Sequence, residues 1–222
     1  MLNLEKLRIH KAHSRWLEGF FVQNPVLTRG LALPFAIVVT NNLKYGVAVS
    51  ILMICSLIPC VLLSRLVGQR LPKWPMLMIC ALLSMVIIMM ALPLVTPISA
   101  EITDTLGIYI PILSLNSIIS FLCLRHRKNQ PFLLALVDAL TYSGGFALAL
   151  CLISALRELW GANTIWGIPV TLPLKIGGLQ IAFSGFLVTA LLSALFRAIE
   201  RCFRARIYRL SNPSAGKEGS FS

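Results

Sequence analysis

The sequence predicts an all-α membrane protein with six transmembrane helices arranged as a three-plus-three inverted repeat. Three observations lead to this prediction: the composition, a series of charge-free apolar runs, and the distribution of positive charge between those runs. Of the 222 residues, 57% are hydrophobic and only 13% are charged, and the mean hydropathy is +0.83. A soluble protein surface needs considerably more charge than this. The composition therefore excludes a soluble enzyme and favours a chain that spans a bilayer.

Residues 1–24 are expected to form a basic amphipathic segment on the cytoplasmic surface of the membrane. Charged residues interrupt the stretch, so it lacks the apolar core of a signal peptide. Trp16 and Phe20 supply an apolar face next to the basic side chains, as in helices that lie in the membrane interface. His10 and His13 are three residues apart there, but no third ligand is near, so we interpret them as part of a solvated helix face.

Residues 25–204 are predicted to form the membrane domain. Six stretches are apolar enough to be candidate spans: 26–40, 45–64, 75–95, 106–124, 132–156 and 177–196. The stretch 26–40 would cover about 23 Å as a helix, whereas the hydrocarbon core is about 30 Å thick. It also contains Gly30 and Pro34, and the stretch 106–124 contains Gly107 and Pro111. We therefore expect the first and fourth helices to be short and interrupted.

Positive charge separates to one side of these six stretches. If the N-terminus is cytoplasmic, 17 Lys and Arg residues fall on that side and 3 on the other. The positive-inside rule then places both termini of a multi-pass membrane protein in the cytoplasm. Because topology accounts for the net charge of +12, the charge gives no reason to expect nucleic-acid binding.

The interrupted stretches are the first of each half of the chain, with the halves at about 25–95 and 106–204. Three spans per half require the second half to enter the membrane inverted, and interrupted helices of inverted repeats meet near the midplane, where they can hold an ion, a substrate or a cofactor. The alternative is two ordinary spans that each tolerate a proline. Residues 205–222, rich in Ser, Gly and charged residues, are expected to form a flexible cytoplasmic tail.

Four motifs resemble the paired integral-membrane subunits of Rnf and Na⁺-translocating Nqr redox complexes. They are Asn24-Pro25-Val26-Leu27 with Leu31-Ala32-Leu33-Pro34-Phe35-Ala36 and Val39-Thr40; Leu106-Gly107-Ile108-Tyr109-Ile110-Pro111-Ile112 with Asn116-Ser117; Asp138 with Gly145; and Leu156-Arg157-Glu158 with Gly161 and Gly167-Ile168-Pro169. With a cytoplasmic N-terminus, the chain resembles the E-type subunit of Rnf and the D-type subunit of Nqr.

This resemblance implies a six-helix inverted repeat that pairs with a homologous subunit of opposite topology and with other subunits of the complex. It implies an electron-transport complex that couples redox chemistry to Na⁺ or H⁺ translocation, in which this chain is not a catalyst alone. A non-redox transporter, a channel-like protein and a structural paralogue remain the alternatives. No nucleotide-binding, metalloprotease or hydrolase motif occurs in the sequence.

The resemblance also implies an iron or [2Fe–2S] centre shared between the two subunits, with one cysteine on each interrupted helix. The two ligand positions are occupied here by Leu33 and Ser117. A leucine cannot coordinate a metal, and a serine hydroxyl is a poor ligand for iron. We therefore expect no cofactor or metal in this chain. Cys123 would lie about 9 Å from Ser117 along a helix axis and on another face, so relocation of the ligand is not favoured.

Several polar residues fall within or beside the apolar stretches. Asp138 is interpreted either as an ion or proton position or as a structural carboxylate bonded to Thr141, to Lys128 or to a neighbouring helix end. Asn116 is expected to bond to backbone that is freed where its helix is broken. Arg157 and Glu158 are interpreted as an interfacial anchor beside an aromatic belt.

The remaining predictions concern a loop histidine and the cysteines. We interpret His126, among basic residues, as a further loop cation. The cysteines, five of which lie in apolar runs without a CxxC motif, are expected to be buried thiols that act as small hydrophobic side chains.

Overall fold

The computed structural model describes residues 24–68, 70–98, 102–126, 132–170, 173 and 176–211. This part of the chain is helical apart from turns and one short hairpin. The predicted amphipathic segment 1–24 lies outside the described residues except for Asn24. The last helix continues through Ser211, into the segment predicted as a flexible tail, and residues 212–222 lie outside the described range.

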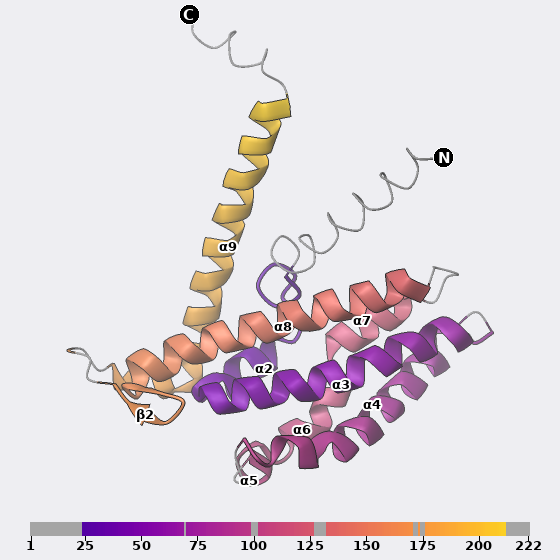
Figure 1. Ribbon diagram of the computed structural model, residues 1–222, viewed down its shortest axis with the longest axis horizontal. Coiled ribbons are helices and arrows are strands. Elements are labelled where there is room, and N and C mark those ends of the chain that lie inside the picture. The colour runs from indigo at the N-terminus through magenta and orange to yellow at the C-terminus, as the bar shows by residue number, and fades with distance from the viewer. Residues whose placement is uncertain are drawn as a thin grey trace, which may run out of the picture.

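Three long helices lie side by side and form the body of the protein (Figure 1). They are α3 (Leu43–Val67), α4 (Lys73–Val95) and α8 (Phe132–Gly161). At 1.5 Å per residue, each is long enough to cross a hydrocarbon core of about 30 Å. Their apolar composition and length follow from the second, third and fifth apolar stretches of the sequence.

The first apolar stretch does not form a spanning helix. It consists of turns over residues 25–29, the six-residue α2 (Leu33–Val38) and the 3₁₀ segment η2 (Val39–Asn41). Gly30 has φ 68° and Ala32 has φ 60°, so the chain turns sharply just before α2. Pro34 stands in the first turn of α2, where a missing N–H costs no helical hydrogen bond.

The fourth stretch and the residues just before it form four helical pieces. These are α5 (Ile102–Leu106), α6 (Tyr109–Ile112), the 3₁₀ segment η3 (Leu113–Leu115) and α7 (Ser117–His126). One break falls at Gly107, with φ 39°, and another at Asn116, whose ψ of 135° is extended. The first and the fourth stretches are therefore both interrupted, as predicted, although Pro111 lies within α6 and the second break of the fourth stretch falls at Asn116.

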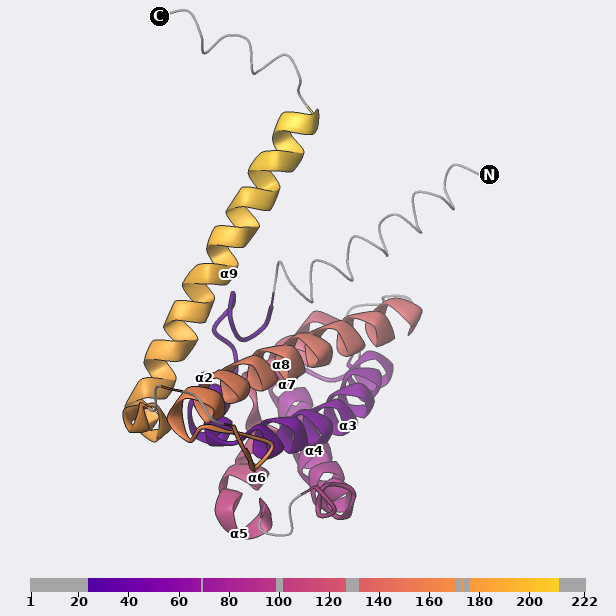
Figure 2. The same ribbon diagram turned by 60° about the vertical axis from the view of Figure 1, so that its left-hand side comes forward.

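The chain leaves α8 through a small hairpin and returns as a long final helix. The hairpin pairs β1 (Thr164–Ile165) with β2 (Ile168–Pro169), and η4 (Gly177–Gln180) leads into α9 (Ala182–Ser211). In both ribbon views α9 starts beside the end of α8 and then rises away from the three-helix body (Figure 2). It contacts the first interrupted stretch, since Ser193 Oγ donates to the Leu27 carbonyl and Arg197 Nη2 donates to the Thr28 carbonyl at 3.2 Å.

Five segments of the described chain are long and apolar enough to cross a membrane. They are Leu43–Val67, Lys73–Val95, Tyr109–His126, Phe132–Gly161 and Ala182–Ile199. An all-α membrane protein is therefore confirmed, while the first predicted span is too short to be a sixth helix of this kind.

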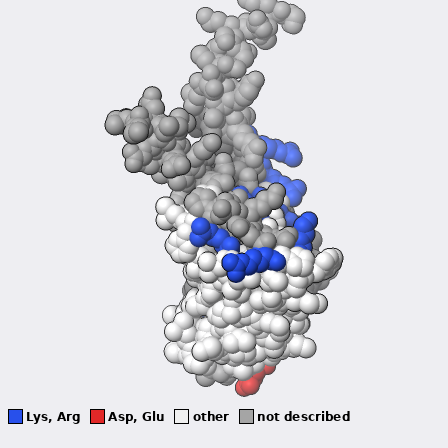
Figure 3. All heavy atoms as spheres, turned by 90° about the vertical axis from the view of Figure 1, so that its right-hand side faces the viewer, with Lys and Arg blue, Asp and Glu red and all other residues white. Residues whose placement is uncertain are grey.

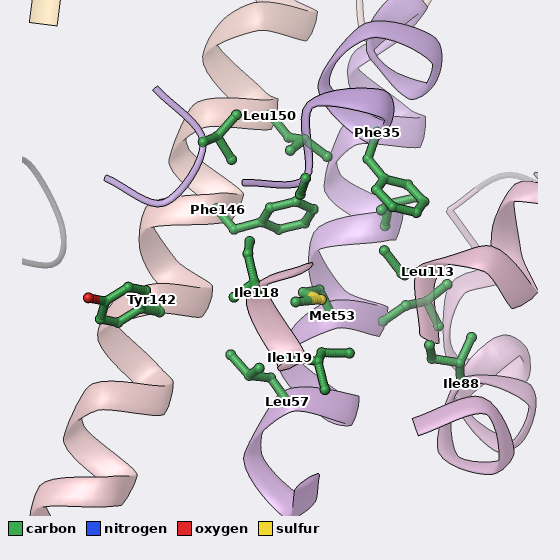
Figure 4. Close-up of a cluster of buried hydrophobic side chains, with 14 of the residues drawn as sticks. Phe35, Met53, Leu57, Ile88, Leu113, Ile118, Ile119, Tyr142, Phe146 and Leu150 are labelled. Atoms are coloured by element: carbon green, nitrogen blue, oxygen red, sulfur yellow. The ribbon is translucent and has the colours of Figure 1, made fainter. Parts of the chain in front are cut away.

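The core lies where both interrupted stretches pack against α3, α4 and α8. Figure 4 shows Phe35, Leu113 and Ile118 from the interrupted stretches against Met53 of α3 and Phe146 of α8. All five side chains are at most 4% exposed. Burial of apolar side chains between helices from both halves thus holds the two broken segments against each other.

Candidate site between the interrupted segments

The two positions at which the family resemblance places metal ligands lie close together in space. Ser117, the first residue of α7, accepts a hydrogen bond at its Oγ from the Ala32 backbone N–H at 3.0 Å. Leu33 directly follows Ala32 in the chain and is the first residue of α2. Residues 85 positions apart are thus brought together by the fold, although neither carries a thiol.

This meeting point lies at the surface of the chain. Leu33 is 37% exposed, Leu115 is 68% exposed, and Pro34 and Ser117 are also exposed. In contrast, the Asn116 side chain between Leu115 and Ser117 is buried and lies against Met53 of α3. The site is therefore open on one side.

The residues present do not fit the iron centre that the resemblance implies. Leu33 offers only hydrocarbon, and the Ser117 oxygen already accepts the Ala32 N–H. Iron and iron–sulfur clusters are held by thiolate, imidazole or carboxylate groups. Within the described residues, no group of three or more His, Cys, Asp or Glu side chains could hold a metal ion.

Asn116 serves the broken backbone and the adjoining helix. Its Oδ1 accepts from the Ile118 N–H at 3.1 Å, which satisfies a donor at the start of α7. Its Nδ2 lies 3.8 Å from the Met53 sulfur on α3. Asn24 plays a similar part at the first segment, where its Oδ1 accepts from Val26 N–H and its Nδ2 donates to the Gly145 carbonyl at 2.8 Å.

Asp138 lies beside two basic side chains at the end of α7, one of the structural partners predicted for it. Its Oδ2 is 3.2 Å from His126 Nε2 and 3.7 Å from Arg125 Nη2, and its side chain is only 6% exposed. The prediction of His126 as a loop cation is wrong, because this side chain is fully buried. A short sequence of one histidine and three basic residues is typical of a loop. The burial of the His126 side chain becomes visible only when α7 packs on α8.

Arg157 is fully buried, so its predicted role as an interfacial anchor is wrong. Its guanidinium donates to the Ile37 carbonyl at 2.6 Å and to Thr40 Oγ1 at 2.7 Å, both at the end of the first interrupted stretch. It also donates to the carbonyls of Leu179 and Ile181, at 3.1 and 3.2 Å. Arg157 therefore satisfies carbonyls freed at two chain breaks, which otherwise would be unpaired inside a membrane.

Glu158 is likewise 2% exposed, and its predicted interfacial role is also wrong. Its Oε2 accepts from the Leu43 N–H at 2.6 Å, at the start of α3, and its Oε1 accepts from the Gly167 N–H at 2.9 Å in the hairpin. A carboxylate at a helix N-terminus is favoured by the helix dipole. Adjacent residues 157 and 158 thus cap opposite kinds of helix end.

Three cysteines from three helices meet in the core, which spacing along the sequence could not predict. The Cys60, Cys80 and Cys123 thiols each donate to a backbone carbonyl, Cys60 to that of Cys80 at 3.4 Å and the other two to that of Cys60 at 3.8 and 3.6 Å. All three are at most 1% exposed. These bonds support the interpretation of the thiols as small packing residues.

The helices and the two broken segments that meet between them define a multi-pass α-helical membrane protein. The family model described as "Rnf-Nqr subunit, membrane protein" matches residues 12–200, and the chain belongs to that family.

Two relatives are similar over part of their length. The E-type subunit of an ion-translocating oxidoreductase complex of Pseudoalteromonas atlantica is 30% identical over 155 residues, which cover 67% of this chain and 64% of that protein. The E-type subunit of a proton-translocating ferredoxin:NAD(+) oxidoreductase complex of Clostridium ljungdahlii is 24% identical over 157 residues, which cover 69% and 72%. The match thus spans slightly less than two thirds of the first relative.

Proposed function

We propose that this chain is an integral-membrane subunit of an Rnf/Nqr-like electron-transport complex that couples redox chemistry to Na⁺ or H⁺ translocation. It acts as a scaffold subunit and is not a catalyst alone. Family membership and the names of both relatives support the complex, and the open half-site at Leu33 and Ser117 supports a partner that completes it. That half-site is the observation on which the proposal chiefly rests.

The proposed partner is a homologous subunit of opposite topology. In this arrangement six membrane segments form a three-plus-three inverted repeat, with α2 and the α5–α7 series as the interrupted first member of each half. The packing of α3 on α8, the second member of each half, supports this symmetry, as does the contact between Ala32 and Ser117.

Within the complex, this chain does not ligate the mid-membrane iron. The donor set supports this proposal: a hydrocarbon side chain occupies one ligand position and a hydroxyl engaged by a backbone amide occupies the other. Any iron at this place is held by the partner. Whether Asp138 takes part in ion movement is decided by transport assays of the assembled complex.

The proposed orientation places both termini in the cytoplasm of a bacterial inner membrane. The ends of α3 and α7 and the starts of α4 and α8 then face the cytoplasm. Lys and Arg side chains gather at that end of the molecule (Figure 3). A reporter fused after Lys217 tests this orientation: it is expected to report the cytoplasm, and an external signal would overturn the proposal.

Affinity purification of the tagged chain from its native membranes tests the function. We expect an opposite-topology homologue and flavin- or NADH-binding subunits in stoichiometric amounts, together with NADH- or ferredoxin-dependent ion transport after reconstitution. Recovery of the chain without redox subunits, combined with solute uptake by the chain alone, would instead support a non-redox transporter. Recovery with neither redox subunits nor uptake would leave a structural dimerisation partner.

A further inference from the structure

Oxygen atoms from two chain breaks surround the guanidinium of Arg157. Its Nη1 donates to two oxygens at the end of the first interrupted stretch, the Ile37 carbonyl at 2.6 Å and Thr40 Oγ1 at 2.7 Å. Its Nε and Nη2 donate to three carbonyls at the end of η4, at 3.1, 3.4 and 3.2 Å, which are those of Leu179, Gln180 and Ile181. All three guanidinium nitrogens are thus bonded within one set of oxygens, which we call the oxygen cage.

The oxygen cage holds the positive charge of Arg157 without a carboxylate. Arg157 is fully buried, and in the part of the chain that the structure describes no carboxylate oxygen lies within 4.0 Å of its nitrogens. The carboxylate of Glu158 instead accepts from the backbone N–H groups of Leu43 and Gly167. A buried charge is costly unless the groups around it stabilise it. Because each cage oxygen carries a partial negative charge, the cage stabilises a cation through its dipoles alone.

Neighbouring groups fix the orientation and the size of the cage. The Thr40 hydroxyl donates its proton to the Ala36 carbonyl at 2.6 Å, so its lone pairs are left for the guanidinium. Gly185 of α9 forms one wall, where an added Cβ would lie 3.1 Å from both Arg157 Nη1 and the Ile37 carbonyl oxygen. The space beside the guanidinium is therefore filled by backbone and leaves no room for a further side chain.

We propose that the oxygen cage is a cation site that the chain fills with its own guanidinium. Neutral donors could bond to the same carbonyls, but they would not balance the negative potential of the converging oxygens. Unwound backbone carbonyls of interrupted membrane helices are also ligands for Na⁺. Arg157 therefore takes the place in which the first interrupted stretch would otherwise hold a free cation, and this break binds no Na⁺ in the unchanged chain. The inference requires neither iron nor redox activity.

Chemical rescue of the variant R157A tests the site, because alanine removes the guanidinium and leaves the cage. The melting temperature, Tm, of the purified full chain is measured in detergent micelles with three probes at equal millimolar concentration. The probes are guanidinium, its neutral isostere urea, and Na⁺, with choline chloride keeping the ionic strength constant. R197A is the matched control, because Arg197 also donates to a carbonyl of the first stretch but is exposed.

We expect guanidinium to raise the Tm of R157A by about 4 °C when its concentration is about ten times its dissociation constant. Na⁺ should raise the Tm less, because one small ion cannot contact the oxygens of both breaks. Urea, which carries no charge, should raise it by less than about 1 °C. The unchanged chain and R197A should respond to each probe by less than about 1 °C.

Two results of the rescue experiment would overturn the proposal. Equal rescue of R157A by urea and guanidinium would show that the cage needs only hydrogen-bond donors and is an ordinary cap. Absence of rescue by any probe, or the same effect on R197A, would show that the cage is not a cation site.

The variants R157K and R157Q keep the proposal testable if R157A does not fold. Lysine keeps the charge on an ammonium donor, whereas glutamine offers amide donors without a charge. We expect R157K to melt at least about 3 °C above R157Q, and an equal or higher Tm for R157Q would contradict a site for a cation. Because every measurement uses the chain alone, failure here leaves the proposed complex untouched, and failure to find redox subunits leaves this site untouched.

Discussion

Replacement of Arg157 by leucine is predicted to destabilise the membrane domain strongly. Leucine keeps much of the side-chain volume but donates no hydrogen bond. The carbonyls of Ile37, Leu179 and Ile181 and the hydroxyl of Thr40 would lose the partner they have at 2.6 to 3.2 Å.

The expected magnitude follows from these four contacts. Hydrogen bonds within membrane proteins contribute on average about 0.6 kcal/mol each, whereas those to charged groups in proteins reach about 1.5 kcal/mol or more. Four lost bonds therefore give about 2–6 kcal/mol, less the cost of burying the guanidinium, which leucine avoids. We expect a net loss of about 3 kcal/mol in the free energy of unfolding.

Reversible unfolding of the purified chain in mixed micelles, with increasing SDS, measures this loss. Arg197→Leu is the matched control, because Arg197 also donates to a carbonyl of the first stretch but is exposed and makes a single such bond. Its expected cost is below about 1 kcal/mol. A loss below about 1 kcal/mol for Arg157→Leu, or equal losses for both variants, would refute the role of Arg157 as the cap of the two chain breaks.

Three further predictions concern groups around the same chain breaks and Asp138. Gly185→Ala should lower the free energy of unfolding by about 1–2 kcal/mol, since a Cβ there would lie 3.1 Å from both Arg157 Nη1 and the Ile37 carbonyl oxygen. Gly178→Ala is the control, because a Cβ at that position meets nothing within 4 Å, and it should be neutral in the same unfolding assay. Glu158→Gln should cost about 1–2 kcal/mol and speed proteolysis of the hairpin, because one of the two backbone N–H groups loses its acceptor and the other keeps only a neutral one. An unchanged cleavage rate would contradict the capping role. Asp138→Asn should lower stability by about 1–3 kcal/mol, because two basic neighbours lose their shared carboxylate; unchanged stability with lost ion transport would assign Asp138 to the ion path instead.

Hydropathy and charge predicted the elements whose properties are local. A long apolar run with few breakers becomes a long helix, so α3, α4 and α8 lie close to their predicted ranges. Steric breakers are local as well, which is why the interruptions near Pro34 and Gly107 could be anticipated. In the first stretch, the turn at Gly30 and Ala32 and the 3₁₀ segment at Val39–Asn41 leave only six residues for α2. That helix is too short to cross a bilayer.

The environments of charged side chains could not be predicted in the same way. Arg157 and Glu158 stand at the end of an apolar run, and charged residues in that position are typical of a membrane interface. Their burial depends on residues about 115 to 120 positions away that fold back over them. The same holds for His126 and for the meeting of three cysteine thiols. By contrast, Leu33 and Ser117 could be named from motif alignment, and the fold then placed them together.

The central claim is that this chain assembles into a redox complex without contributing ligands to its iron. Iron per complex, measured by mass spectrometry for the native complex and for one in which all six cysteines of this chain are replaced by alanine or serine, tests it most directly. We predict the same iron content and electron-transfer rate in both, provided that the variant assembles to the same yield. Loss of iron from an otherwise assembled cysteine-free variant would contradict the claim.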